Sequence, residues 1–199
     1  MMVTDFYWPL LGGVEQHVRS LSHELCARSH RVTVVTMDHG GSPAAEQDGP
    51  VDVVRIPTTT QRLERLFRQP RPWAPPIHDP SAALRLRQLV ADRRPDVVHG
   101  HDWLARSVIG STADRPLVST LHYYPLSCAK KDLMRDGEPC AGPGPAKCVA
   151  CAARHYGVLK GTVTAAAQAA GSALERRATD HTIAVSRATA TGNGLALDD

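Results

Sequence analysis

The 199-residue sequence predicts an α/β fold, in which a Rossmann-like, doubly wound and mostly parallel sheet carries a cysteine-containing insertion. Short apolar runs rich in β-branched residues alternate with amphipathic segments of helical length, as expected for a parallel sheet covered by helices. A Gly-Gly pair separates the first apolar run from the first helical pattern. The composition, 42% hydrophobic and 22% charged, is that of an ordinary globular domain.

The first half of the chain predicts three strands and one helix. Residues 1–6 form an apolar run that predicts the first strand. Apolar residues then recur at helical spacing over residues 14–29, which predicts an amphipathic helix. The β-branched run at 31–37 predicts a strand covered on both faces, and a third strand is expected at 51–56, after a loop rich in Gly, Ser, Pro and Asp.

The second half continues the alternation. Five prolines between residues 69 and 80 predict an irregular loop, and the helix through 84–90 is expected to end before Pro95. The remaining predicted elements are strands at 96–99, 116–120 and 181–185, a helix at about 104–111 and a largely helical stretch at 148–178. The prediction is a sheet of about six strands.

Charge and hydropathy narrow the possible partners and location. The formal net charge of +3 does not indicate a basic surface of the kind that binds the phosphates of nucleic acid, so no nucleic-acid partner is expected. There is no apolar window long enough to span a bilayer and no signal-peptide pattern, which favours a cytoplasmic location. Alternating basic and apolar residues at 62–68 leave two interpretations open, a peripheral contact with the inner face of a membrane and a solvated helix packed on the domain.

Residues that could carry chemistry follow the predicted strands, where doubly wound sheets bind their ligands. Gly12 and Gly13 precede a helix N-terminus, where they either admit an anion or only make a tight turn. His122 follows a strand and could act as a general base, hydrogen-bond donor or polariser, or be a satisfied loop histidine. Glu15 and His17 lie in the first turns of the helix and could be surface residues.

The stretch His99-Gly-His101-Asp102 could suggest a metal site. We do not favour one, because neighbouring residues of a strand point to opposite faces and no third ligand stands at a familiar spacing.

Four cysteines fall within a Gly/Pro-rich insertion at residues 126–155. They are Cys128, Cys140, Cys148 and Cys151. This spacing suits a structural zinc site, which would order a segment poor in apolar residues; two disulfides, four free thiols or an iron–sulfur cluster are the alternatives. Because the insertion follows His122, we expect it to shape what the neighbouring site binds, whereas Cys26, alone on the first helix, is expected to be a small buried hydrophobe.

Several blocks occur in order along nearly the whole chain: FYWP at 6–9, GGVEQHV at 12–18 with leucines at 21 and 25, HRVTVVT at 30–36, DVVHGHD at 96–102, TLH at 120–122 and AVS at 184–186. Together they resemble the N-terminal, acceptor-side domain of the family 4-like retaining glycosyltransferases of the GT-B fold. The resemblance implies that residues 1–199 form that domain. It also implies transfer of a sugar from a nucleotide-sugar donor to an acceptor, as in hexosyltransferases, with the stereochemistry retained and no cofactor required.

The resemblance also implies roles for individual residues. Gly12 and Gly13 would lie against the donor diphosphate, and His122 would contact the donor sugar near the reaction centre as the catalytic residue. Acceptor or cleft positions would fall at Glu15, His17, His101 and Asp102.

One departure from the family pattern concerns the second domain, which carries the nucleotide pocket and is absent from this sequence. We therefore expect half of an enzyme, incomplete alone, that needs its C-terminal donor domain or a partner chain; the acceptor is not identified. The alternative is a non-catalytic binding module or partner subunit derived from the domain. An epimerase of the same fold is not favoured, because no carboxylate pair for proton transfer is evident.

Overall fold

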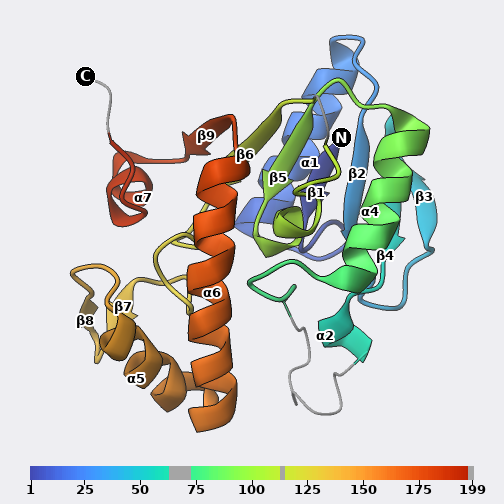
Figure 1. The fold of residues 1–199 in the computed structure, drawn as a ribbon. Coiled ribbons are helices and arrows are strands. Elements are labelled where there is room, and N and C mark those ends of the chain that lie inside the picture. Colours follow the sequence, from blue (N-terminus) through green and yellow to red (C-terminus); the bar gives the residue numbers. More distant parts are fainter. Residues whose placement is uncertain (63–72, 113–114, 197–199) are drawn as a thin grey trace.

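The computed structural model describes residues 1–62, 73–112 and 115–196 (Figure 1). Its centre is a seven-stranded sheet in the order β3-β4-β2-β1-β5-β6-β9, in which all neighbouring strands are parallel except β3 and β4. The strands are β1 (Met2–Thr4), β2 (Thr33–Met37), β3 (Ala45–Asp48), β4 (Val51–Ile56), β5 (Val98–His101), β6 (Leu117–Leu121) and β9 (His181–Ala184).

Helices cover this sheet, and a small hairpin lies apart from it. The helices are α1 (Gly13–Ala27), α2 (Thr59–Arg62), α4 (Pro80–Arg93), α5 (Pro145–Tyr156), α6 (Val158–Ala178) and α7 (Arg187–Gly192), with a 3-10 helix, η1 (Trp103–Ser107), and the hairpin β7 (Met134–Arg135) and β8 (Glu138–Pro139). The β7–β8 hairpin and α5 lie beside α6, on the β6–β9 side of the sheet (Figure 1). Among the described residues, there is no helix with the length and apolar character needed to cross a bilayer.

The predicted α/β class is confirmed, and so is each predicted strand, with shifts at the ends. The first strand is shorter than the predicted 1–6, and β5 begins two residues later than the predicted 96–99 and includes His101. The helix predicted at 104–111 is wrong in type, because the chain forms a 3-10 helix there that ends at Ser107. The helical stretch at 148–178 is confirmed as two helices separated by Gly157, whose φ is +86°.

Other elements escaped prediction. The polar segment of β3 was expected to be a loop, but it pairs with β4 as an antiparallel edge strand, which needs no apolar alternation. Neither α2 nor α7 was expected. Of the predicted irregular loop at 69–80, residues 73–79 contain no helix or strand. The amphipathic pattern at 62–68 lies, except for Arg62, outside the described residues.

The sheet separates two apolar clusters, one on each face. Val3 packs with Leu86 of α4 and Leu104 of η1 in one cluster, while Met2 packs with Val14 and Val18 of α1 in the other. The alternation of side chains along a strand produces this division, so the short strand β1 contributes to both cores. Helices on both faces make the sheet doubly wound.

The strand order also determines where a ligand can bind. The chain leaves β1 for β2 on one side and later reaches β5 on the other, so the order reverses at β1. At such a point the loops that follow adjacent strands diverge and leave a crevice at their carboxyl ends. The loops after β1, β5 and β6 therefore form the candidate site.

One fully buried side chain, Arg106 of η1, connects the walls of this crevice. Its Nε donates to Glu175 of α6 at 2.8 Å, and its terminal nitrogens donate to the backbone oxygens of Pro76 and Pro125 at 2.5 and 3.1 Å. Glu175 also accepts a hydrogen bond from Ser119 of β6 at 2.9 Å. Both charges are paired, so neither is left buried without compensation.

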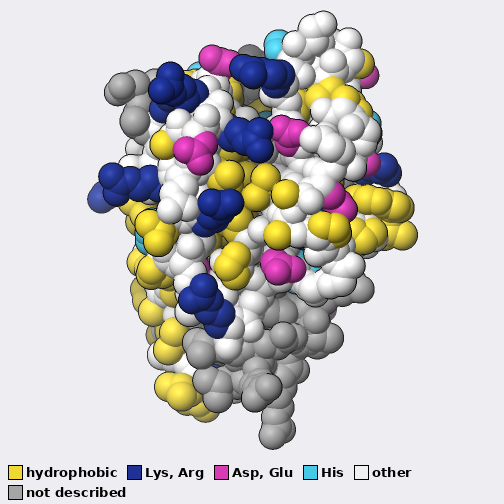
Figure 2. Space-filling view, turned by 90° about the vertical axis from the view of Figure 1, so that its right-hand side faces the viewer, with side chains coloured by type: hydrophobic (Ala, Val, Ile, Leu, Met, Phe, Trp, Pro, Cys, Tyr) yellow, Lys and Arg dark blue, Asp and Glu magenta, His cyan; other side chains and the backbone are white. Residues whose placement is uncertain are grey.

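The face over α4 and β3 differs from this interior. Basic and acidic side chains lie interspersed there among apolar ones (Figure 2). An exposed ion pair between Arg93 and Asp52, with 3.1 Å between nitrogen and oxygen, belongs to the same edge of the molecule.

We predict that Arg106→Met lowers the free energy of unfolding by about 3 to 5 kcal/mol, because it leaves the Glu175 carboxylate buried without its partner. Arg93→Met is the matched control, and it should cost less than about 1 kcal/mol because its ion pair is exposed. Urea unfolding followed by circular dichroism measures both. Equal losses in the two variants would contradict this account of Arg106.

Candidate functional site

Asp5, which follows β1, lies at the bottom of the crevice with its side chain fully buried. Its two carboxylate oxygens accept the backbone N–H groups of Leu104 at 2.7 Å and Ala74 at 3.1 Å. Burial raises the pKa of Asp5 to about 6, while the charge of Lys131 lowers it. Sequence reasoning missed Asp5, although its position directly after a buried strand was a usable signal.

Three histidines meet at the carboxyl ends of the strands. His101 ends β5 and is fully buried, and its Nδ1 lies 3.0 Å from Nε2 of His122, which follows β6. His17 reaches them from α1, with its ring centroid 4.9 Å from that of His122. The structure therefore brings together three of the predicted site residues from three separate segments.

Burial keeps the inner histidines of this group in the neutral form. It lowers the pKa of His101 well below the ordinary histidine value. It also lowers the pKa of His122, against the Asp102 carboxylate, which raises it. A neutral imidazole has one donor and one acceptor nitrogen, so one of the two rings donates to the other across the His101–His122 contact. His101 Nε2 is buried and has no hydrogen-bond partner among the described residues.

The same trio could hold a metal ion. Its ring nitrogens lie within 4.8 Å of one another, and neutral imidazole is a common ligand of zinc. Sequence reasoning found no third ligand beside His101 and Asp102. It named His17 and His122 as candidate site residues but did not foresee that they meet His101. His99 instead contacts Thr120 Oγ1, at 2.7 Å from its Nε2, and burial lowers its pKa to about 4.

Asp102 stands where the chain turns from β5 into η1. Its φ of +66° is in the left-handed region, which is uncommon for a residue other than glycine. Its carboxylate lies 3.5 Å from Nζ of Lys131, a residue of the segment after His122. Sequence reasoning placed Asp102 at the cleft but gave no indication of Lys131.

The N-terminus of α1 opens beside the histidines. Gly12 is its N-cap residue, and no described side chain caps the helix. A Cβ added at Gly13 would meet no described atom within 4 Å, whereas one at Gly12 would lie 2.2 Å from the Glu15 carboxylate. The space beside Gly13 is open and faces the positive end of the helix dipole, which suits an anion, while the Glu15 carboxylate of the same turn lies against Gly12.

Aromatic side chains line a hollow of about 260 Å³ on the other side of the histidines. Trp73, Trp103 and Tyr123 contribute walls, and Lys131 Nζ lies 3.5 Å from the ring centroid of Trp73. A larger hollow of about 540 Å³ is lined by residues at the amino ends of the strands, and it includes none of the predicted site residues.

The cysteines occupy two places. Cys128, Cys140, Cys148 and Cys151 line one small hollow in the segment after His122, apart from the three histidines. Cys26 is half-buried on α1, with its sulfur 3.6 Å from the backbone oxygen of Pro50, so it is less buried than expected.

Comparison with known proteins gives this site a context. The glycogen synthase of Mycobacterium tuberculosis (strain CDC 1551 / Oshkosh) is 33% identical over 135 residues, which cover 61% of this chain and 33% of that protein. One subunit of the phosphatidylinositol N-acetylglucosaminyltransferase of Homo sapiens is 49% identical over 39 residues, or 20% of this chain and 8% of that protein. The chain spans about a third of the glycogen synthase.

The fold also matches a solved structure. The crystal structure of Os79 from O. sativa in complex with UDP superposes with a TM-score of 0.52 and 14% identity, over 94% of this chain and 46% of that chain. The sequence itself matches the family model for Glycosyltransferase Family 4 over residues 11–191. This match extends from the open turn before α1, through the three histidines, to α7. The chain therefore belongs to glycosyltransferase family 4.

Proposed function

We propose that this chain is the acceptor-side half of a retaining hexosyltransferase, which moves a sugar from a nucleotide-sugar donor to an acceptor. The observation that carries the proposal is the position of His122, which contacts His101 of β5 and His17 of α1 and is followed directly by Tyr123 of the aromatic hollow. UDP in the Os79 complex supports a nucleotide-sugar donor. The chain spans 33% of the glycogen synthase and 46% of the Os79 chain, and we assign donor-nucleotide binding to residues outside the sequence given.

In this proposal the donor diphosphate binds at the N-terminus of α1. Gly13 leaves its surroundings open, so an oxygen of the diphosphate can approach the backbone N–H groups of the first turn. The helix dipole then offsets part of the negative charge that develops on the leaving group. With this electrostatic support from the protein, the proposed reaction needs no metal ion.

In this proposal His122 lies beside the donor sugar. Its Nε2 contacts His101, which leaves Nδ1 as the nitrogen that can meet the substrate. The neutral ring can donate or accept one hydrogen bond at the reaction centre without introducing a positive charge.

The acceptor is placed against the aromatic hollow and the polar residues around it. Aromatic faces can cover the apolar face of a sugar ring, while Lys131 and Asp102 can hydrogen-bond to hydroxyl groups. Glu15 and His17 border the same crevice on α1. If the acceptor is a lipid, transfer takes place at the inner face of a membrane.

We predict that His122→Ala lowers kcat for sugar transfer by about 100-fold or more, because the contact at the reaction centre is lost. The assay mixes the chain with a donor-binding domain of the family and a panel of labelled nucleotide sugars, and it determines the anomer of the product. His30→Ala is the matched control, since His30 is exposed and lines the hollow at the opposite edge of the sheet. An unchanged rate in His122→Ala would refute the catalytic role, and no transfer from any donor by the wild-type mixture would favour a binding module.

Gly13→Ala separates donor binding from folding. The added methyl group meets no described atom, so the melting temperature should not fall, but the methyl would stand between the diphosphate and the helix N-terminus. We expect about a tenfold or greater rise in the donor KM. Ser20→Ala, at an exposed position of the same helix, should leave the KM unchanged. A donor KM that does not move in Gly13→Ala would contradict the diphosphate placement.

The pH dependence follows from the direction in which the pKa of His122 is shifted. Because burial lowers this pKa, the ring stays neutral in weak acid, and the transfer rate should decline only below the ordinary histidine value of about 6.5. Asp102→Asn removes a charge that raises the pKa, so the acidic limb of the kcat profile should move to lower pH. A limb that stays in place or moves to higher pH would show that another group controls the rate.

A further inference from the structure

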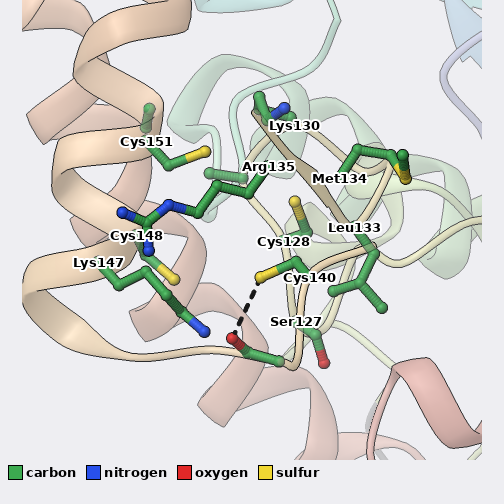
Figure 3. Close-up of a pocket in the computed structure, with 13 residues that line it drawn as sticks. Ser127, Cys128, Lys130, Leu133, Met134, Arg135, Cys140, Lys147, Cys148 and Cys151 are labelled. Atoms are coloured by element: carbon green, nitrogen blue, oxygen red, sulfur yellow. Dashed lines mark hydrogen bonds between the residues drawn. The ribbon is translucent and has the colours of Figure 1, made fainter. Parts of the chain in front are cut away.

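The four cysteines of the segment after His122 surround one hollow of about 20 Å³. Cys148 and Cys151 lie three residues apart on α5, and Cys128 and Cys140 belong to the chain before and after the β7–β8 hairpin. Figure 3 shows the sulfur atoms of all four arranged around the same space. All four thiols are free in the structure.

We propose that Cys128, Cys140, Cys148 and Cys151 bind one structural Zn²⁺ ion as thiolates. Four thiolates are the ligand set of many structural zinc sites, and two ligands three residues apart on one helix can share a single ion. Because Cys128 and Cys140 flank the β7–β8 hairpin and Cys148 and Cys151 lie on α5, the ion would connect the hairpin to α5.

The size of the hollow favours a single ion. A space of about 20 Å³ accommodates roughly one water-sized atom, whereas an iron–sulfur cluster also needs room for its inorganic sulfides. Zinc requires only the four sulfur atoms. Among the described residues, the three histidines are the group whose ligand atoms already lie close enough for one ion, so the four sulfur atoms would have to draw together on zinc.

Hydrogen bonds to sulfur support thiolate character. The backbone N–H of Gly144 donates to Cys148 Sγ at 3.3 Å. Such bonds stabilise negative charge on a ligand and orient it, as second-shell contacts do in metal sites.

The charge around the hollow is complementary to the proposed centre. A zinc ion with four thiolates carries a net charge of −2. Lys130, Arg135 and Lys147 line the hollow. The Asp132 carboxylate, 3.8 Å from Cys128 Sγ, pairs with Lys130 at 3.2 Å. The Nε of Arg135 is buried and makes no hydrogen bond to a described residue, although Asp136 Oδ2 lies 3.4 Å away. A thiolate would give this donor an acceptor.

The segment has only a small apolar cluster of its own, which it shares with α6, although α5 also packs along α6. In the described part of the chain, its apolar cluster contains three buried alanines, with Val149 and Tyr156 packed against them. Strands β7 and β8 have two residues each, and Lys131, Leu133 and Asp136 all adopt positive φ. A small core with several left-handed residues is the situation in which a metal ion supplies folding free energy.

The proposed zinc also has a consequence at the cleft. Lys131 belongs to the loop that the ion would anchor, and its ammonium lies near both Asp102 and Asp5, at 3.5 and 4.0 Å. The ion would thus fix the position of a charged group that borders the proposed acceptor region.

The test is the metal content of the full chain, purified without chelator from zinc-supplemented cells and measured by mass spectrometry. We expect one zinc per chain, and its loss in Cys148→Ser combined with Cys151→Ser. Two controls should keep the zinc. Cys26→Ser removes the cysteine outside the cluster, and His17→Ala disrupts the three histidines, which could otherwise account for one bound ion.

A measurement on the unsubstituted chain covers the case in which the cysteine variants do not fold. Titration with a mercurial should release one zinc for every four thiols modified, and Co²⁺-loaded protein should show the absorption of a tetrahedral thiolate site. A zinc-free chain with reactive thiols or disulfides would overturn the proposal. So would iron with acid-labile sulfide, or zinc that is lost in His17→Ala and kept in the double cysteine variant.

Discussion

The guanidinium of Arg106 holds together the parts of the chain that form the crevice. It bonds to the loop before α4 through Pro76, to the chain after His122 through Pro125 and to α6 through Glu175. Gly171 permits this contact, since a Cβ there would lie 2.1 Å from the oxygen of Pro76. Arg106 lies in η1, which follows β5 directly. Its hydrogen bond to Pro125 therefore links the strand that ends at His101 to the chain that follows His122. The placement of the histidines therefore depends on a buried, fully paired charge.

A second balance of charge lies at the bottom of the crevice. Asp5 and Asp102 are two buried carboxylates, and the basic group near both is Lys131, which is contributed by the cysteine-containing segment. Burial raises the pKa of Asp5 to about 6, and the Lys131 charge opposes that rise. The segment is thus joined electrostatically to the centre of the sheet, and changes in its order reach the residues proposed to meet the acceptor.

Sequence patterns predicted the parts of this structure that depend on local order. Buried β-branched runs identified β2 and β4, and the positions of Gly12, Gly13 and His122 after strands identified the edge that carries the site. The polar edge strand β3 gave no such signal. The partners of Asp5 were also hidden, because its hydrogen bond to Leu104 joins residues 99 positions apart. The meeting of His17 with His101 and His122 likewise arises from the packing of α1 against the strands, which periodicity does not report.

In the proposed site, one set of groups makes hydrogen bonds to the sugar, and another stabilises negative charge on the leaving group. Burial lowers the pKa of His101 and of His122 and so favours their neutral forms, which offer directional hydrogen bonds and no net charge. Negative charge on a leaving diphosphate is instead met by the open N-terminus of α1, whose dipole cannot be lost by deprotonation. A site built in this way keeps its electrostatic stabilisation across a range of pH, while the reacting sugar still meets a group that can exchange a proton. The arrangement suits a transfer in which the charge develops on the phosphate, and the hydroxyl of the acceptor needs positioning more than ionisation.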